Sequence, residues 1–241
     1  MGKALVVGVG PLDGLGAQLC VRFAREGLQV FAAGRTKEKV EQVVAAIRGQ
    51  GGRATALVGD ASQPPEVAQL FESVDREGGE LDLVVYNAGN AALGDLLEME
   101  PAQFEAVWRL TCYGGFLVGQ QTGRRMVAQG RGSLLFTGAS ASVRGRPPFG
   151  AFASAKAGLR SLAQTMARAW GPRGVHVAHV VIDGAIGGEK IKKNLPQVAE
   201  RLGEDGMVGL DGLAHAYWSL HAQPKNAWTF EIDVRPYKET W

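Results

Sequence analysis

The feature that most constrains the fold of this chain is a regular alternation of two kinds of segment. Short apolar runs rich in β-branched residues recur along the sequence, and stretches with the period of an amphipathic helix separate them. The runs are apolar on both faces, which is typical of strands in a parallel sheet covered by helices on both sides. We expect strands at residues 4–7, 30–33, 54–58, 81–86, 133–137, 175–182 and 228–234.

Helical patterns fill the intervals between these runs. Leu15 and Leu19 begin one such pattern, and residues 101–129 and 150–171 carry longer ones. Strand and helix therefore alternate throughout, which predicts an α/β fold with a doubly wound, Rossmann-like parallel sheet. The 34 glycines punctuate the runs as turns, and no linker-like shift in composition occurs, so we expect a single domain over residues 1–241.

Composition excludes several functional classes. The 26 Lys and Arg residues nearly balance the 24 Asp and Glu residues, so the formal charge of +2 favours neither nucleic acid nor an acidic membrane as partner. No apolar run reaches membrane-spanning length, and the first residues lack the apolar core of a signal peptide. Cys20 and Cys112 are too few for a disulfide framework. We therefore expect a cytoplasmic protein with no nucleic-acid or membrane partner.

A glycine-rich turn follows the first apolar run and leads into the first helical pattern. Residues 8–16 read G-V-G-P-L-D-G-L-G, which contains the spacing G-x-x-x-G-x-G. Glycine permits the tight turn, lets a pyrophosphate approach the backbone, and leaves helix N–H groups aimed at it. The place between a strand and a helix favours nucleotide binding over a purely structural turn. The cofactor-binding residues expected here are Gly10, Leu12, Asp13, Gly14, Leu15 and Gly16.

The ends of the second and third apolar runs indicate which dinucleotide binds. Gly34-Arg35 offers no carboxylate to a ribose 2′-hydroxyl, but it does offer a guanidinium to a 2′-phosphate. This favours NADP(H) over NAD(H), the alternative being a solvated arginine at a helix start. Asp60 and Ala61 come just after the third run, where an adenine would lie. A helix N-terminal turn explains those two residues nearly as well.

The fourth run ends in Tyr86-Asn87-Ala88-Gly89, and Lys156 lies early in the long helical pattern at 150–171. Together with the glycine turn, these residues resemble the short-chain dehydrogenase/reductase family over nearly the whole chain. The resemblance implies that family's fold and nicotinamide cofactor. It also implies supporting positions beside the cofactor for Asn87, Ala88 and Gly89. After the sixth run, Ile186 would meet the nicotinamide carboxamide through its backbone.

The catalytic residues that the resemblance implies are largely replaced. The family uses Y-x-x-x-K, with the tyrosine as general acid and the lysine lowering its pKa while holding the nicotinamide ribose. This chain reads F-A-S-A-K from Phe152 to Lys156. The family's serine falls on Ala139, beside Ser140, and its proton-relay asparagine falls on Thr111. The cofactor positions are thus kept, while three of four catalytic positions depart.

These departures change the chemistry that we expect. A positioned acid contributes about 10²–10⁴-fold to a rate, and oxyanion donors contribute a comparable factor, so standard ketone reduction is disfavoured. Hydride transfer remains open for an iminium, an activated enone or a carbonyl, because the cofactor carries that chemistry. A cationic substrate would also suit the Phe152 ring through cation–π attraction. Replacement donors in the sequence are Ser140, Ser142, Ser154, Arg144 and Tyr113.

The sequence therefore predicts an atypical NADP(H)-dependent oxidoreductase acting on a small organic substrate. Lys156 would hold the ribose, Thr111 and Ser140 would be the remaining polar groups, and Phe152 would form the wall of the site. A catalytically silent NADP-binding sensor or scaffold, or a partner subunit of active relatives, fits Lys156 as well. The resemblance and the aromatic segment 228–241 also imply a homodimer or homotetramer.

The histidines and one glycine-rich segment also carry predictions. His176 and His179 lie three residues apart on one strand and are expected to pack on opposite faces, and no group of residues has metal-ligand spacing, so we expect no metal. Residues 187–193 are glycine-rich and then basic. In the family this region is a mobile lid over the substrate. An exposed helix start is the alternative.

Overall fold

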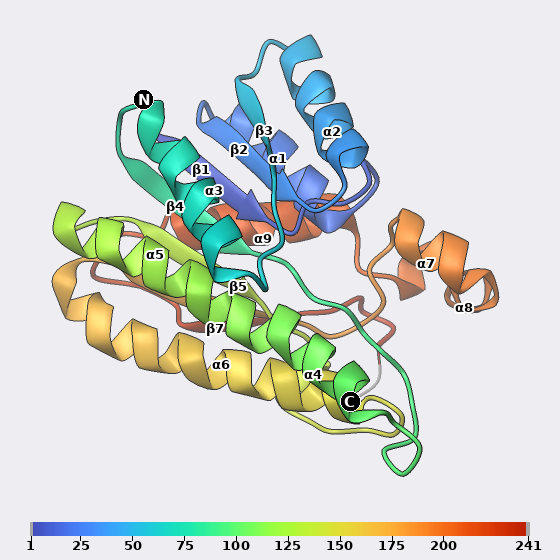
Figure 1. Ribbon diagram of the computed structural model, residues 1–241. Helices are drawn as coiled ribbons and strands as arrows, with labels where there is room; N and C mark the ends of the chain where they lie inside the picture. Colours follow the sequence, from blue (N-terminus) through green and yellow to red (C-terminus); the bar gives the residue numbers. More distant parts are fainter. Residues whose placement is uncertain (1, 240–241) are drawn as a thin grey trace.

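Seven parallel strands form one sheet in the order β3-β2-β1-β4-β5-β6-β7 (Figure 1). The computed structural model describes residues 2–239. Residues 1 and 240–241 lie outside the described residues, and they include both ends of the expected 1–241 domain and the end of the aromatic segment 228–241. The strands are β1 (Lys3–Val7), β2 (Gln29–Gly34), β3 (Ala54–Val58), β4 (Leu81–Tyr86), β5 (Ser133–Thr137), β6 (His176–Ile182) and β7 (Glu231–Val234).

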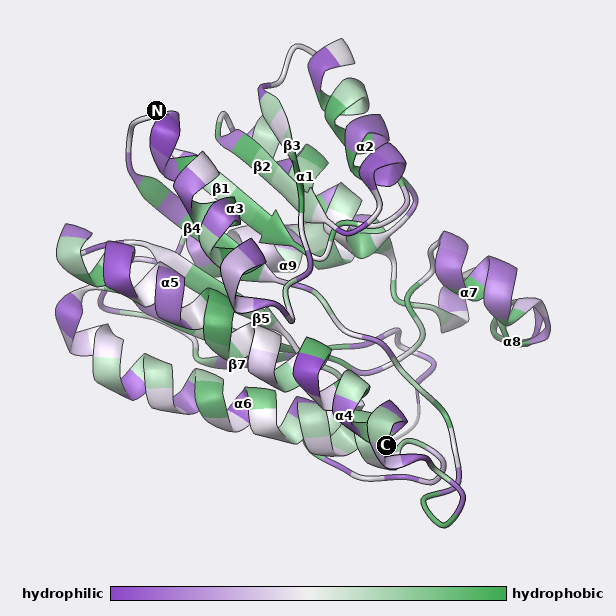
Figure 2. Cartoon of the chain, in the orientation of Figure 1, coloured by the Kyte–Doolittle hydropathy of each residue, from purple (hydrophilic) through white to green (hydrophobic). Residues whose placement is uncertain are grey.

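Helices cover both faces of this sheet, which confirms the doubly wound α/β prediction (Figure 1). Phe23, Val43 and Tyr217 represent the core on one face, whose helices are α1 (Leu15–Arg25), α2 (Lys37–Gly49) and α9 (Leu210–His221). The opposite core is covered by α3 (Pro64–Arg76), α5 (Gly114–Gln129) and α6 (Gly150–Trp170). Figure 2 shows the hydrophilic side of α2 turned outward and apolar colour along the strands. No helix among residues 2–239 is long and apolar enough to cross a membrane.

The last strand is shorter than its sequence pattern predicts. It begins at Glu231 rather than at residue 228, because the preceding residues contact side chains of β6 instead of extending the ladder. The Trp228 ring stacks on His176 at a centroid distance of 4.9 Å, and the Thr229 carbonyl lies 2.9 Å from His176 Nε2. His176 thus packs inside the protein as expected.

Glu231 links the edge strand β7 to α6 and β6 through its carboxylate. Its carboxylate accepts hydrogen bonds from Arg160 of α6 at 2.6 and 2.8 Å and lies 2.9 Å from His179 Nδ1 on β6. Burial is the main reason that the pKa of His179 falls to about 4, so the imidazole is neutral at pH 7. His179 is a packing residue held between sheet and helix, as expected.

Residues 101–129 do not form the uninterrupted helix that their pattern indicates. They form α4 (Pro101–Trp108), a π-helical turn (Arg109–Tyr113) and α5. The Gly114 N–H closes the π-helical turn by donating to the Arg109 carbonyl, five residues earlier. The extra residue in this turn changes the direction in which its side chains point.

Two short helices, α7 (Glu189–Asn194) and α8 (Pro196–Leu202), follow β6 and project beside the sheet (Figure 1). The glycine-rich turn between β1 and α1 is one part of the chain that they contact. The Glu189 N–H donates to the Asp13 carbonyl at 2.7 Å, and Lys192 Nζ lies 3.5 Å from the Asp13 carboxylate. The α7–α8 segment is therefore attached to the turn between β1 and α1.

Candidate functional site

The carboxyl ends of all seven parallel strands lie at one edge of the sheet, and the candidate site is built there. At the β1–α1 turn, a Cβ atom on Gly16 would lie 2.7 Å from the Gly8 carbonyl oxygen, so close packing of turn and helix requires glycine. A Cβ atom on Gly10 would meet nothing within 4 Å, so Gly10 borders open space. Gly14 precedes α1, and no side chain caps the helix there. The first N–H groups of α1 are thus available to an anion.

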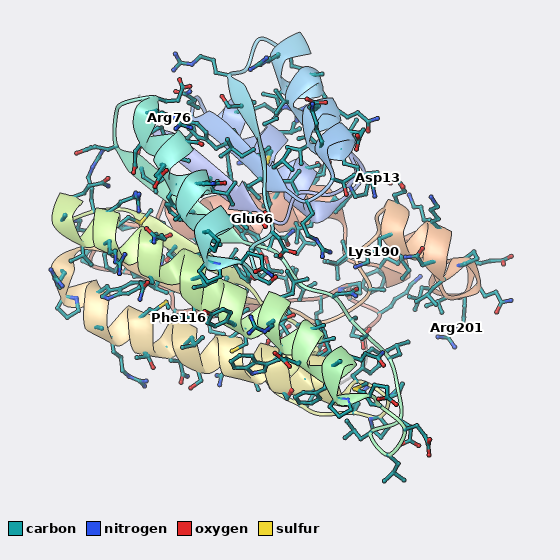
Figure 3. The ribbon with its side chains drawn as sticks, in the orientation of Figure 1. Asp13, Glu66, Arg76, Phe116, Lys190 and Arg201 are labelled. Carbon is teal, nitrogen blue, oxygen red and sulfur yellow. The ribbon has the colours of Figure 1, made fainter. Side chains whose placement is uncertain are left out.

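The other three residues expected in this turn have different surroundings. Leu12 is exposed, and its carbonyl accepts a hydrogen bond from Gln18 at 3.0 Å. Leu15 is buried in the core beneath α1. Asp13 faces the α7–α8 segment through the two contacts described above (Figure 3). The turn therefore offers a ligand mainly its backbone.

Arg35 and Asp60 lie side by side where β2 and β3 end. Arg35 is exposed, and its Nη1 atom is 3.9 Å from Asp60 Oδ2. Asp60 Oδ1 accepts the Ser62 N–H at 2.9 Å, which is the helix-turn role considered as the alternative for this residue. Ala61 is buried against the same core as α3. A guanidinium beside a carboxylate therefore borders the place expected for the adenosine ribose.

Asn87 links three central strands. Its Nδ2 donates to the Gly8 carbonyl after β1 at 3.0 Å, and its Oδ1 accepts the Thr137 hydroxyl of β5 at 3.1 Å. Gly8 has a φ of +100°, and a Cβ atom there would overlap the backbone of Ala88. Asn87 and Ala88 thus brace the turn against β4.

Gly89 marks the point where two polar side chains meet. A Cβ atom on Gly89 would lie 3.5 Å from Lys156 Nζ and 3.6 Å from Thr111 Oγ1. Both side chains are buried, and the Thr111 hydroxyl has no hydrogen-bond partner among the described residues. The fold therefore brings together Thr111 of the π-helical turn and Lys156 of α6.

The Lys156 ammonium group contacts a backbone carbonyl of β5 and an aromatic ring of its own helix. Its Nζ donates to the Thr137 carbonyl at 2.6 Å and lies 5.6 Å from the centre of the Phe152 ring. Burial, and to a smaller extent the positive charge of Lys190, lowers the pKa of Lys156 to about 8. Figure 3 shows Lys190 between α7 and the sheet. The site is thus electropositive at neutral pH.

The serines proposed as replacement donors have unequal surroundings. Ser142 Oγ accepts the Ala139 N–H at 3.1 Å, and Ser154 Oγ donates to the Ala151 carbonyl at 2.9 Å. Both hydroxyls therefore support local structure. Ser140 is half-buried, and within residues 2–239 its hydroxyl has no hydrogen-bond partner. Ser140 is the serine that stays available.

Arg144 and Tyr113 are also engaged elsewhere. Arg144 Nη2 lies 2.7 Å from the buried carboxylate of Asp183, which Arg235 also approaches at 3.3 Å. Tyr113 stacks on Trp108 at a centroid distance of 6.3 Å. The Arg144–Asp183 pair links the β5–α6 loop to the end of β6.

Ile186 stands where the chain leaves β6 for the α7–α8 segment. It forms a one-residue parallel bridge with Val208, made by the Gly187 N–H and the Ala185 carbonyl at 3.0 and 2.8 Å. These bonds belong to its neighbours, and the Ile186 N–H has no acceptor among the described residues. The backbone of Ile186 is therefore available to a ligand.

Tyr86 has a contact that the sequence did not predict. Its hydroxyl donates to the Leu110 carbonyl in the π-helical turn. The adjacent pair Gly114-Gly115, which leaves room for the ring, is the signal that could have indicated this contact. No group of three or more metal-ligating side chains lies together in the described part of the chain.

Comparisons with known proteins agree on one relationship. The sequence model for short chain dehydrogenase matches residues 3–194. The chain is 32% identical over 177 residues to a short-chain dehydrogenase/reductase of Armillaria gallica, covering 72% of this chain and 67% of the relative. It is 38% identical to a short-chain dehydrogenase of known structure from Rhodopseudomonas palustris, with a TM-score of 0.83 and coverage of 98% and 99%. A metagenomic short-chain oxidoreductase solved in complex with NADP shares the fold, with 24% identity, a TM-score of 0.83 and coverage of 98% of each chain.

Proposed function

The chain belongs to the short-chain dehydrogenase/reductase family, and we propose that it reduces a small, uncharged organic electrophile, such as an activated enone or ketone, with NADPH. The convergence of Lys156 and Thr111 beside Gly89 carries this proposal. These two groups replace the hydrogen-bond donors that the family resemblance assigns to tyrosine and serine. As a member of this family, the chain is an oxidoreductase.

The residues at the sheet edge fit a dinucleotide. The open space at Gly10 and the uncapped start of α1 suit a pyrophosphate, because a side chain at either place would occupy the room that it needs. The N–H of Ile186 suits a carboxamide oxygen. When bound, the nicotinamide supplies a hydride.

Arg35 supports NADP(H) as the preferred form. Its exposed guanidinium can bind a 2′-phosphate, and Asp60 at 3.9 Å keeps the guanidinium on this side of the turn. The metagenomic oxidoreductase of the same fold was solved with NADP. In this arrangement the phosphate competes with Asp60 for Arg35, so affinity depends on the charge of Asp60.

Lys156 and Thr111 would act on the oxygen of the substrate. Addition of hydride to an enone or ketone leaves negative charge on that oxygen, and fixed donors in a buried site stabilise it. The Lys156 ammonium then gives one proton to the oxygen and is recharged from solvent. The proton from Lys156, together with one hydride from the bound nicotinamide, would account for the dihydro product.

The charge of the site favours an uncharged electrophile over the iminium considered from the sequence. The Phe152 ring already has a cation at 5.6 Å, the ammonium group of Lys156. Lys190 adds a second positive charge near the same site. A cationic substrate would therefore meet repulsion at the place where developing negative charge is stabilised.

Calorimetric titration and an NADPH-oxidation screen test this proposal. We expect NADPH to bind more tightly than NADH and to be oxidised with enones or activated ketones, but not with cyclic imines at pH 6, where they are cationic. The variant Lys156→Met, similar in length and without charge, is the control for turnover. Binding without any turnover would instead support the silent sensor or scaffold. Failure to bind either nucleotide would overturn the cofactor assignment.

We also propose that the chain forms a homodimer through the side of α4 and α5 that carries stacked aromatic rings. Trp108 is 40% exposed and stacks on Tyr113, which stacks on Phe116 at 6.1 Å. Exposed aromatics of this kind are enriched in interfaces. Light scattering on Trp108→Glu should show a monomer if this side is the interface, and an unchanged mass would exclude it.

A further inference from the structure

Tyr86 inserts its side chain beneath the π-helical turn. It ends β4, it is fully buried, and its ring meets Phe136 of β5 edge-on at a centroid distance of 6.3 Å. Its hydroxyl donates to the Leu110 carbonyl. Burial raises the pKa of Tyr86 above its ordinary value, so the hydroxyl stays protonated and remains a donor.

The Leu110 carbonyl is available to Tyr86 because of the π-helical turn. In an uninterrupted α-helix this carbonyl would accept the Gly114 N–H. Here that N–H donates to Arg109 instead, which removes the usual partner of Leu110. The Tyr86 hydroxyl supplies a donor to this half-buried carbonyl in place of the Gly114 N–H. The hydroxyl therefore stabilises the π-helical turn relative to a regular helix.

Two glycines make room for this contact. A Cβ atom on Gly114 would overlap the Tyr86 hydroxyl and lie 2.8 Å from the Ala61 carbonyl oxygen. A Cβ atom on Gly115 would lie 3.3 Å from Tyr86 Cε1. The helix thus has no side chain at the two positions where the ring and hydroxyl of Tyr86 approach it.

Thr111 is the next residue after the carbonyl that Tyr86 holds. Its hydroxyl is buried, lacks a partner among the described residues, and lies near Lys156 beside Gly89. Thr111 lies within the π-helical turn, whose wider winding sets the direction of its side chain, so a regular helix over residues 109–113 would turn this hydroxyl in another direction. The placement of Thr111 therefore depends on the π-helical turn.

We infer that Tyr86 is a positioning residue whose hydroxyl holds the π-helical turn and thereby keeps the Thr111 hydroxyl beside Lys156 at the substrate. The inference rests on the proposed function where it gives Thr111 a role on the substrate. Its structural half, that Tyr86 holds the turn, stands without any turnover.

The kinetic test is a double-mutant cycle between Tyr86→Phe and Thr111→Val. Each change removes one hydroxyl and leaves the shape of the side chain nearly the same. We expect each variant to lower kcat about tenfold with the KM for NADPH within about twofold, and the double variant to be no worse than Thr111→Val alone. Additive losses would overturn the inference, because Tyr86 would then act independently of Thr111.

The matched control is Thr122→Val. Thr122 is buried in α5, and its hydroxyl donates to the Val118 carbonyl at 2.8 Å, far along the helix from the turn. This variant loses a buried hydroxyl without touching residues 109–114. An equal loss of kcat in Thr122→Val and Tyr86→Phe would mean that general destabilisation explains both, and would overturn the inference.

Hydrogen exchange measured by mass spectrometry provides the second readout on the full chain. We expect residues 109–115 to exchange about tenfold faster in Tyr86→Phe and at the wild-type rate in Thr122→Val. Gly114→Ala, which blocks the approach of the hydroxyl, should reproduce the faster exchange. Unchanged exchange in Tyr86→Phe would overturn the inference. Absence of turnover in the wild-type chain would overturn the proposed function instead, while the exchange result would still decide the role of Tyr86.

Discussion

The β1–α1 turn and the region around α6 face the same edge of the sheet, but different parts of the chain build them. In the turn, the important contacts are between backbones, as the 2.7 Å approach of a Gly16 Cβ to the Gly8 carbonyl shows. Around α6, the important groups are side chains, Lys156 and Thr111, which come from separate elements. Close backbone contacts can be predicted from the spacing of glycines. Contacts between side chains of distant elements leave no local pattern in the sequence.

This difference explains why the family resemblance predicts conserved positions for the first region and replaced catalytic residues for the second. A dinucleotide is bound largely by N–H groups and open space, which many side chains leave intact. Proton transfer needs a particular group at a particular point, so replacing one side chain changes the reaction. Family membership therefore carries more information about the first region than about the second.

Replacing Lys156 gives the largest test of the second region. We expect Lys156→Met to lower kcat for the preferred electrophile by about 10²–10⁴-fold, because the proposed acid is lost. Stopped-flow measurement of NADPH oxidation checks this. Wild-type turnover in the variant would show that Lys156 is not the acid. The proposed role of the β1–α1 turn would be unaffected.

The lowered pKa of Lys156 should make kcat and the free energy of unfolding change in opposite directions as the pH rises. With a pKa of about 8, the ammonium group is present below pH 8, and kcat should fall about tenfold per pH unit above it. The unfolded chain binds this proton up to its ordinary pKa of 10.5, so this group's contribution to the free energy of unfolding rises between pH 8 and 10.5. A kcat that is flat to pH 10 would contradict the proposed acid.

Substitutions at two glycines of the β1–α1 turn should affect stability and NADPH binding differently. Gly16→Ala should lower the free energy of unfolding by about 3 kcal/mol, because its Cβ would press on the Gly8 carbonyl. Gly10→Ala should leave stability within about 1 kcal/mol and weaken NADPH binding, because its Cβ would enter open space. Urea unfolding and calorimetry measure the two effects. Equal destabilisation of both variants would show that the turn has no room for a ligand.

Phe152→Tyr should restore a donor to the second region. We expect reduction of simple ketones to rise about 10–100-fold, because a phenol beside Lys156 supplies the missing acid. Phe152→Leu, which has no donor, is the control and should show no gain. If the tyrosine variant binds NADPH normally without any gain, then Phe152 does not face the substrate.

The smallest expected effect concerns Arg35. Arg35→Glu should shift the preference from NADPH toward NADH by about tenfold, because one charge-assisted hydrogen bond to the 2′-phosphate is lost. Arg25→Glu makes the same change of charge elsewhere, at a side chain that contacts Gln50. The ratio of the two dissociation constants is the measurement. A ratio that changes equally in both variants would assign the effect to net charge alone.

The sheet was predictable because each strand is a local pattern. The runs at 54–58, 81–86 and 133–137 coincide with β3, β4 and β5. The strand predicted at 228–234 is too long, because β7 begins at Glu231. Trp228 stacks on His176, which is far away in the sequence, and the local pattern cannot show that contact. Periodicity records burial, but it does not record which neighbour causes the burial.

The candidate site was predictable to a smaller extent. Its members Lys156 and Thr111 came from the family resemblance, and the structure brings them together, while their roles stay predictions. The π-helical turn could not be predicted from residues 101–129, since the Tyr86 hydroxyl that supports it belongs to another element. Likewise, only the folded chain shows that Ser142 and Ser154 are already hydrogen-bonded.

Glu231 also bears on how the protein is made. The Arg160 side chain projects from the helix that carries Lys156, yet its partner Glu231 is translated long after that helix. On the ribosome, α6 can form and cover β5 while Arg160 and the buried His179 still lack their carboxylate. The helix therefore gains this ion pair only when β7 joins the sheet, and a nascent chain released before residue 231 would carry α6 without it.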